Sequence, residues 1–241
     1  MTSLHRHTAL LDSNILASMT LTDIFVQLAV DDVFQAKWTN DIHHEWIAAV
    51  LKFRPWIKPQ KLERRRLQMD AETREALVTG YEGIVDELHL PDASDRHVLA
   101  AAIHGGCGRI VTKNLTHFPV DILSPHGIVA VHPDTFLMEL LEAATLQFCG
   151  AAKSVIVRAR RPRYSVEEYL TNLRRASLQE TGSVSLSVET KNFTTEDTEK
   201  RRLYAISLCP SFLCGENEFP PTSIHYQETA AELEQFRDLL S

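Results

Sequence analysis

Three acidic side chains, those of Asp12, Glu45 and Asp95, stand at positions where acids can share a ligand. Asp12 directly follows the apolar run Leu10-Leu11, which is typical of a short buried strand. An acid at the carboxyl end of such a strand faces the crevice in which α/β sheets bind ligands. Asp12 can also cap a helix, and both roles hold only if its side chain is shared between them.

Glu45 lies one turn into an expected helix that Asn40 can cap. Its neighbours Ile42 and Trp46 belong to the apolar face of that helix, so Glu45 falls at the edge of this face. The alternative is an ordinary solvated surface glutamate.

Asp95 lies at the start of another expected helix, which follows the turn Leu90-Pro91-Asp92. Asp92 is suited to the N-cap, which places Asp95 at the third helical position, where a negative charge is favourable. Simple capping is therefore the alternative to a ligand role for Asp95. The small side chains of residues 100–102 favour tight packing of this helix on a sheet, with its first turn close to the strand ends.

Carboxylates from three separate elements that converge in one crevice do not all remain ionised without a cation. Hard oxygen ligands of this kind suit Mg²⁺ or Mn²⁺. A metal ion held by carboxylates can activate water and stabilise the charge of a phosphate under attack. No local motif fixes the ligands, so the spacing alone does not establish the site.

Short apolar runs alternate with longer periodic segments over the first 145 residues or so. The pattern predicts strands over 8–11, 36–39, 109–112 and 127–131, and helices over 21–34, 40–54, 59–77, 98–103 and 133–141. Gly105-Gly106 is expected to end the helix over 98–103. This alternation favours a three-layer α/β domain with a mostly parallel sheet, here expected over residues 1–145.

The composition is that of a globular protein, with 44% hydrophobic and 24% charged residues and a net charge of −7. The acidic balance argues against a histone-like nucleic-acid binder but leaves room for a local basic patch. Four cysteines without a CxxC pair indicate free thiols in a reducing compartment rather than a zinc ribbon. With no apolar run of roughly 18–20 residues and no signal peptide, we expect a cytoplasmic protein.

The rest of the chain has a different pattern. We expect a basic helical extension over 146–181, opened in part by a capping box at Ser165, then an insertion without regular structure over 182–229 and a terminal helix over 230–241. The triplet Gln-Glu-Thr at 179–181 recurs at 227–229, which suggests a duplication at the ends of the insertion. A three-residue repeat can also arise by coincidence.

Four sequence blocks occur together in one order. They are Leu10-Leu11-Asp12-Ser13-Asn14-Ile15-Leu16, Trp38-Thr39 with Glu45-Trp46, Leu90-Pro91-Asp92 with Asp95 to Ala102, and Ile110-Val111-Thr112-Lys113-Asn114 with Phe118-Pro119. This set resembles the PIN domain and, more narrowly, the ribonucleases of VapC-like type II toxin–antitoxin modules, over about residues 8–180. The resemblance implies a three-layer α/β/α fold and RNA cleavage that depends on Mg²⁺ or Mn²⁺. It also implies neutralisation by a small antitoxin, and a homodimer is compatible with it.

The same resemblance matches Asp12, Glu45 and Asp95 to the metal-binding acids of the family. Many relatives carry a fourth acid in the last block, where this chain has Asn114 and His117. The resemblance therefore implies three negative charges and either a weaker second metal site or a single one. Four further residues are expected to support the site: Asn14, Thr112, Asn114 and His117. Of these, Thr112 is expected to orient Asp12 or a water through its hydroxyl group.

Two basic stretches can steer a polyanion to this acidic protein, although either can also be a solvated helix face. They are Lys58, Lys61 and Arg64 to Arg66, and Lys153, Arg158, Arg160, Arg161 and Arg163. The pair His43-His44 precedes Glu45, but no further histidine at a matched spacing supports a soft-metal site there.

The sequence is compatible with two other functions. The same acids can serve a phosphohydrolase of small phosphates, although no glycine-rich phosphate cradle or nucleophile motif is present. The chain can also be a weakened PIN-like module that binds RNA or antitoxin without cleavage, as the missing fourth acid and the insertion suggest.

Overall fold

The computed structural model describes residues 8–158, 166–176 and 178. Four short strands in this part form one parallel sheet in the order β2-β1-β3-β4. The strands are β1 (Thr8–Leu11), β2 (Gln35–Lys37), β3 (Arg109–Val111) and β4 (Val129–Val131). Leu10 pairs with Lys37 on one side and with Ile110 on the other, so β1 is central. The mixed α/β class with a parallel sheet is as predicted and is consistent with a PIN-like α/β/α fold.

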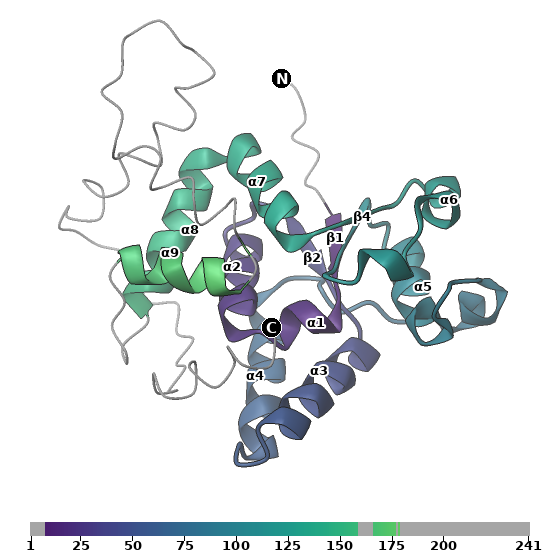
Figure 1. Ribbon diagram of the computed structural model, residues 1–241, viewed down its shortest axis with the longest axis horizontal. Helices are drawn as coiled ribbons and strands as arrows, with labels where there is room; N and C mark the ends of the chain where they lie inside the picture. Colours follow the sequence, from purple (N-terminus) through teal and green to yellow (C-terminus); the bar gives the residue numbers. More distant parts are fainter. Residues whose placement is uncertain (1–7, 159–165, 177, 179–241) are drawn as a thin grey trace, which may run out of the picture. The chain divides into compact units, whose positions relative to one another are not determined.

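The helices alternate with the strands along the chain (Figure 1). They are α1 (Ser13–Leu16), α2 (Met19–Val30), α3 (Asn40–Phe53), α4 (Pro59–Glu72), α5 (Arg96–His104), α6 (Val120–Leu123), α7 (Pro133–Ala143), α8 (Thr145–Arg158) and α9 (Val166–Arg175). Single 3₁₀ segments occupy Glu82–Glu87, Ala93–Asp95, Leu115–His117 and Ser124–His126.

The strand β1 and the helix α5 contribute much of the core. Ala9, Leu10 and Leu11 of β1 are fully buried, and so is every residue from 98 to 102 in α5, which packs against β1 and β3. The small side chains of α5 allow this close approach, as expected from the sequence. The helix ends at His104 with Gly105 as its C-cap, a position that favours glycine because a Cβ atom there would lie only 3.0 Å from the Ala101 carbonyl oxygen. This packing brings the first turn of α5 toward the sheet.

Two predicted helix boundaries, the start of α3 and the end of α4, are wrong, and the contacts of the chain explain both. Thr39, not Asn40, caps α3, since its hydroxyl oxygen accepts a hydrogen bond from the Ile42 amide at 3.1 Å. Helix α4 ends at Glu72 rather than continuing to Leu77. The chain after it turns back to the sheet, where the amide of Trp38 donates to the carbonyl oxygen of Ala76 at 2.9 Å and Val78 returns a bond to Trp38.

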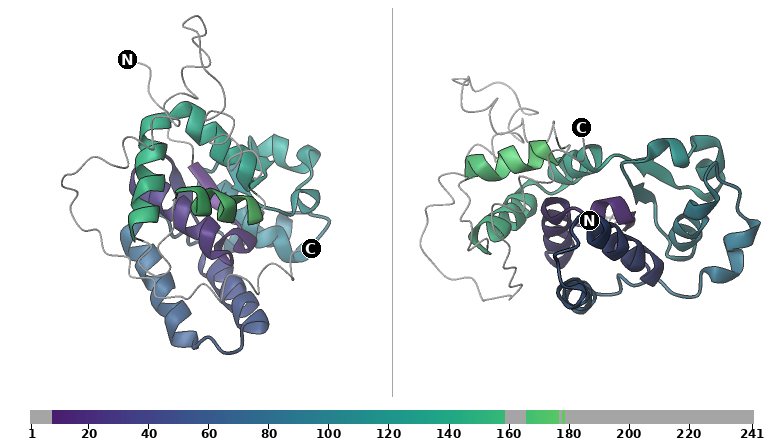
Figure 2. Two further views of the ribbon diagram at one scale, coloured as in Figure 1. Left: turned by 60° about the vertical axis from the view of Figure 1, so that its left-hand side comes forward. Right: turned by 60° about the horizontal axis from the view of Figure 1, so that its bottom comes forward.

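Helices α3 and α4 lie side by side, as Figures 1 and 2 both show, and a partly exposed carboxylate joins them. Asp70 of α4 accepts hydrogen bonds from Trp38 Nε1 at 2.8 Å and from Arg66 at 3.0 Å, and its Oδ1 lies 3.1 Å from His43 Nε2. Trp46 Nε1 donates to His43 Nδ1 at 2.8 Å. We refer to Trp38, His43, Trp46, Arg66 and Asp70 as the Asp70 cluster.

The contacts divide the chain into two units after Phe136. In the second unit, α8 begins at Thr145 and buries Phe148, Ala151 and Val155 at helical spacing. Helix α9 runs from Val166 to Arg175, within the helical extension expected over 146–181. The ranges 182–229 and 230–241, and Ser165 of the expected capping box, lie outside the described residues, so the domain boundaries proposed from the sequence stay predictions.

Two other predictions concern the absence of a membrane-spanning segment and the state of the cysteine thiols. In the described part of the chain, no helix combines the length and the apolar character needed to cross a membrane. Cys107 is a buried free thiol, and burial raises its pKa to about 12. A thiol in that state is a small packing group rather than a nucleophile.

Candidate functional site

Asp12 is the buried centre of the candidate site. It directly follows β1, with its amide bonded to the Val111 carbonyl oxygen at 3.1 Å, and its side chain is only 5% exposed. One carboxylate oxygen caps α1 by accepting from the Ser13 amide at 2.6 Å. The other oxygen accepts from Thr112 Oγ1 at 2.6 Å and from Asn14 Nδ2 at 2.7 Å. The two oxygens are therefore shared between capping and the crevice.

Asn14 and Thr112 tie the ends of β1 and β3 together. Asn14 Nδ2 also donates to Thr112 Oγ1 at 2.9 Å, and its Oδ1 accepts from the Lys113 amide at 3.2 Å. The Asn114 amide donates to Thr112 Oγ1 at 3.0 Å, whereas the Asn114 side chain is exposed. The contact expected between Thr112 and Asp12 is present, and every side chain that holds Asp12 is neutral.

Glu45 reaches the site from α3 and meets a histidine that the sequence reasoning missed. Its Oε1 lies 2.7 Å from Nε2 of His97 on α5, and the Glu45 side chain is 43% exposed while that of His97 is 14% exposed. Burial lowers the pKa of His97, but the carboxylates of Glu45, Asp41 and Asp12 outweigh it and leave that pKa raised.

Asp41 is a further acid that the sequence reasoning missed. It precedes Glu45 by one helical turn on α3 and accepts a hydrogen bond of 2.6 Å from the Tyr81 hydroxyl. Burial and the Asp41 carboxylate raise the pKa of Tyr81 to about 12, so this hydroxyl remains a donor at neutral pH. The i, i+4 spacing of Asp41 and Glu45 was the available signal, because it places both carboxylates on one face of α3.

Asp95 does not act as the simple cap that was the alternative for it. The carboxylate of Asp92 caps the short 3₁₀ turn Ala93–Asp95 by accepting from the Ser94 amide, while Asp95 makes no capping bond to α5. Instead, Asp95 Oδ2 lies 2.7 Å from His117 Nδ1. The Asp95 carboxylate is therefore not used in a capping bond and can contribute to the site.

Asp92, Asp95 and His117 each offer one ligand atom, and these atoms all lie within 4.8 Å of one another. Among the described residues, this is the only group of three that meets the distance, and it includes neither Asp12 nor Glu45. Asp92, considered from the sequence only as a cap, is therefore also close enough to contribute charge.

The carboxylates of Glu45 and Asp95 nevertheless act on Asp12 electrostatically. Burial raises the pKa of Asp12, and the carboxylates of Asp95 and Glu45 raise it further, against the opposing hydrogen bonds from Thr112 and Ser13. Asp12 follows β1, Glu45 lies on α3 and Asp95 directly precedes α5, so the three acids come from three separate elements. A buried carboxylate with two further acids near it favours the binding of a cation.

The neighbouring histidines do not form a soft-metal site. His43 is fully buried, and its Nδ1 accepts from Trp46, so its Nε2 carries the proton and donates to Asp70. Both ring nitrogens are thus engaged within the Asp70 cluster.

Two comparisons with known proteins found matches. The family model described as VapC50 C-terminal domain matches residues 133–184. The chain is also 45% identical, over 82 residues, to a protein of Mycobacterium tuberculosis (strain ATCC 25618 / H37Rv) named "Putative ribonuclease VapC50". The resemblance to VapC-like proteins is confirmed. The aligned stretch is 34% of this chain and 46% of the relative, so the chain spans about half the length of this VapC-like relative. No solved structure matches the chain.

Proposed function

We propose that the protein is a metal-dependent endoribonuclease and the toxin of a toxin–antitoxin module. The proposal rests on the buried carboxylate of Asp12, which is held by neutral donors and whose pKa is raised by burial and by the carboxylates of Asp95 and Glu45. The resemblance to VapC-like proteins, one of which is named a ribonuclease, supports RNA as the substrate.

The donor set fits a hard divalent cation. The partners of Asp12, Glu45 and Asp95 among the described residues are hydroxyl, amide and imidazole groups, and no Lys or Arg side chain pairs with them. Carboxylate oxygens without a cationic partner are suited to Mg²⁺ or Mn²⁺. Asp12, Glu45 and Asp95 would hold this metal ion, and His117 and Asn114 stand where relatives carry a fourth acid. When bound, the ion supplies an activated water and stabilises negative charge on the scissile phosphate.

The protein's own groups have separate tasks in this proposal. Thr112 and Asn14 fix the Asp12 carboxylate in one orientation through two short hydrogen bonds, and a third bond joins Asn14 to Thr112. His97 fixes Glu45, which is otherwise a half-exposed side chain with free rotation. His117 bonds to Asp95 and, from that position, can donate a proton to a phosphate oxygen or share the metal ion.

The partners follow from the same proposal. RNA is the substrate, a small antitoxin protein neutralises the activity, and self-association into a homodimer is compatible with both. Asp92 adds a carboxylate beside Asp95, which offsets part of the charge lost with the fourth acid of relatives. This observation favours an active nuclease over a module that only binds.

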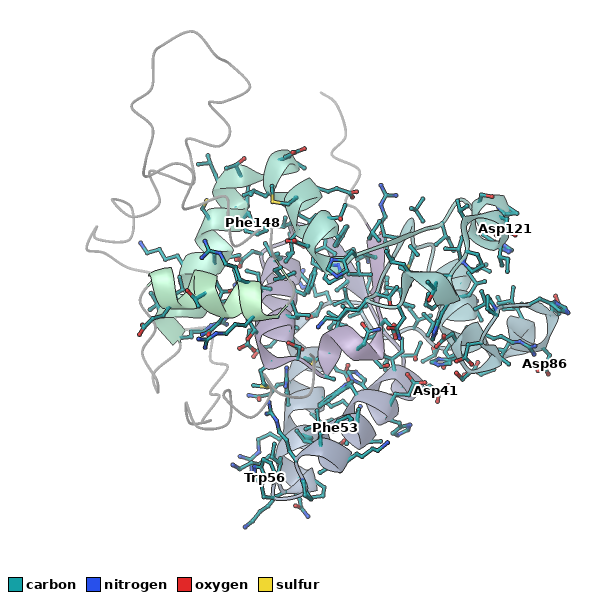
Figure 3. The ribbon with its side chains drawn as sticks, viewed as in Figure 1. Asp41, Phe53, Trp56, Asp86, Asp121 and Phe148 are labelled. Carbon is teal, nitrogen blue, oxygen red and sulfur yellow. The ribbon has the colours of Figure 1, made fainter. Side chains whose placement is uncertain are left out.

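The test is cleavage of RNA by the purified chain with added Mg²⁺ or Mn²⁺ and after removal of metal by a chelator. We expect cleavage that requires metal and that falls at least about 100-fold in Asp12→Asn, Glu45→Gln and Asp95→Asn, since even residues behind the ligands change such sites 10–100-fold. Asp121→Asn is the matched control, because Asp121 is an exposed acid on α6 (Figure 3). Cleavage by Asp12→Asn within about threefold of the wild type would contradict the proposal, and metal-dependent hydrolysis of small phosphates alone would favour the phosphohydrolase.

A further inference from the structure

The end of the α3–α4 pair carries two exposed aromatic side chains that the proposed nuclease site does not use. Phe53, at the last position of α3, is 49% exposed, and Trp56, in the turn before α4, is 54% exposed. Figure 3 shows both at the opposite end of α3 from Asp41. The turn itself is anchored, because Ile57 is 6% exposed and its amide donates to the Arg54 carbonyl oxygen at 3.0 Å. Phe53 and Trp56 are thus presented to solvent by a fixed backbone.

The charge around these aromatic rings is strongly positive. Residues 46–67 contain seven Lys or Arg side chains and a single acid, Glu63, in a chain whose net charge is −7. That acid is already paired with Arg66 at 2.6 Å. The local excess of positive charge is therefore not neutralised within the segment.

Four of these basic side chains, Lys52, Lys58, Lys61 and Arg64, are exposed. Within residues 8–158, 166–176 and 178, none of the four has an acidic partner. Lys58, Lys61 and Arg64 follow one another at i, i+3 spacing, which places them along one side of the start of α4. Lys52 lies over the Phe53 ring, with its Nζ 5.7 Å from the ring centroid. The side of α4 that faces solvent here is a row of cations beside two aromatic rings.

We infer that this surface, the α3–α4 tip formed by Lys52, Phe53, Trp56, Lys58, Lys61 and Arg64, binds single-stranded RNA. Sites for single strands combine aromatic side chains, on which bases stack, with cations that follow the phosphates. Stacking requires unpaired bases, so a duplex can contact the cations of this surface but cannot stack on its aromatic rings. A protein-docking surface is instead depleted of lysine in its centre, where this surface has Lys52 and Lys58.

The position of the tip links it to the proposed nuclease site. Glu45 and Phe53 lie on the same helix, and eight residues of α-helix rise about 12 Å. A strand held at the tip therefore passes the acids within a few nucleotides. The inference rests on the proposed function for the class of ligand, and it adds that the substrate is held as a single strand on one side of the cleavage point.

Binding can be measured separately from cleavage. The chain has three tryptophans, and Trp38 and Trp46 are fully buried, so Trp56 alone is open to a stacking base. In chelator, where no metal-dependent cleavage occurs, a short unlabelled oligouridine is titrated into the full-length protein while tryptophan fluorescence is recorded. Anisotropy of the same oligouridine with a dye label gives the dissociation constant. We expect RNA to quench the Trp56 emission, and we expect duplex RNA to quench it far less.

The variants separate stacking from charge. Trp56→Ala should weaken single-strand binding about 10-fold, and Trp56→Phe should restore most of it, because a phenyl ring still stacks. The combined change of Lys58, Lys61 and Arg64 to glutamine should reduce the slope of log affinity against log salt by about 2. Val120→Ala, which trims an exposed apolar side chain on α6, and Arg74→Gln, which removes an exposed charge beyond α4, are the matched controls.

The outcomes distinguish this inference from the proposed function. Trp56-dependent binding of single strands without any cleavage in Mg²⁺ or Mn²⁺ supports the tip and contradicts the nuclease. Cleavage with an unchanged KM in Trp56→Ala overturns the tip and leaves the nuclease standing. Equal binding of single and double strands that depends on the cations but not on Trp56 also overturns the inference about the tip. The inference is likewise overturned if the variants of the tip lose antitoxin binding while their affinity for RNA is unchanged.

Discussion

Two carboxylates in the first unit have opposite surroundings. Asp70 is a partly exposed acid whose oxygens meet Arg66, the indole of Trp38 and the imidazole of His43. Asp12 is more deeply buried, yet it meets only neutral donors and lies near two further acids. Both groups of residues are dense in hydrogen bonds, so the number of bonds does not distinguish them. The sign of the surrounding charge does.

The difference separates a group that stabilises the fold from one suited to bind a cation. A carboxylate with a guanidinium and two N–H donors is satisfied in the folded chain, and removing it leaves those donors without an acceptor. A buried carboxylate whose pKa is raised by burial and by other acids opposes folding at neutral pH. Such arrangements persist where function requires them, and they are typical of binding sites.

The largest expected effect is a reversal between Asp12→Asn and Asp70→Asn. Asp12→Asn should lower the metal-dependent cleavage activity at least about 100-fold. The free energy of unfolding of this variant without metal should stay the same or rise, because a buried charge is lost. Asp70→Asn should lower the free energy of unfolding by about 1–3 kcal/mol, since Arg66 then meets an amide. Its cleavage per folded molecule should stay near that of the wild type.

Urea unfolding in chelator and RNA cleavage with metal, both on the same protein preparations, measure this reversal. Added Mn²⁺ should raise the unfolding midpoint of the wild type and of Asp70→Asn but not of Asp12→Asn, because binding to the folded state stabilises it. Equal losses of stability in both variants would remove the distinction between the two regions.

The sequence predicts the parts of this comparison that depend on local pattern. An acid after a short apolar run, and a capped helix rich in alanine, place Asp12 and Asp95 near the strand ends, and both predictions rest on neighbours in the chain. The contacts of Glu45 with His97 and of Asp70 with Trp38 join distant segments, and no local pattern contains them. Their geometry is set by how α3 packs.

The N-cap of α3 was predicted at the wrong residue for a related reason. Thr39 and Asn40 both suit an N-cap, and only the backbone conformation at Thr39, with φ −128° and ψ 169°, decides between them.

His97 offers a second way to test the site side of the comparison. His97→Ala should lower cleavage by about 10–100-fold, because Glu45 loses the group that orients it. His97→Gln should recover part of this loss, since its amide can donate to the same carboxylate. If His97 only supported packing, both variants would lose stability and keep their affinity for Mn²⁺, so metal titrations of the folded variants decide the point.

Variants with an added acid at the candidate site should bind a metal ion more tightly than the wild type. Asn114→Asp and His117→Asp each place a carboxylate where the family resemblance implies a fourth acid, and more negative charge increases affinity for a hard cation. We expect Mg²⁺ or Mn²⁺ to bind about 10-fold more tightly, about 1.4 kcal/mol, in at least one of the two variants. The effect should be larger at His117, which already contacts Asp95, than at the exposed Asn114. Unchanged or weaker binding in both variants, measured by calorimetry, would reject the missing-acid hypothesis.

The smallest expected effect is a pH dependence of stability that originates in the Asp70 cluster. Burial lowers the pKa of His43, and the Asp70 carboxylate opposes only part of that change. Below the ordinary histidine pKa of about 6.5 the unfolded chain therefore binds a proton that folded His43 does not. The contribution of His43 to stability is complete above about pH 6.5 and is lost as the pH falls toward the lowered pKa, by at most about 1.4 kcal/mol per pH unit.

His97 has the opposite shift, so its contribution is complete below about pH 6.5 and is lost as the pH rises through its raised pKa. The wild-type profile contains both effects, and only a comparison of variants separates them. His43→Gln should flatten the fall in the free energy of unfolding between about pH 7 and pH 5, whereas His126→Gln, at an exposed histidine, should leave the profile unchanged. An identical pH profile in His43→Gln and in the wild type would mean that His43 does not stay neutral in the folded chain. The Asp70 cluster would then hold a charged imidazole between its carboxylate and Trp46, and the indole of Trp46 would have to give up its bond to Nδ1.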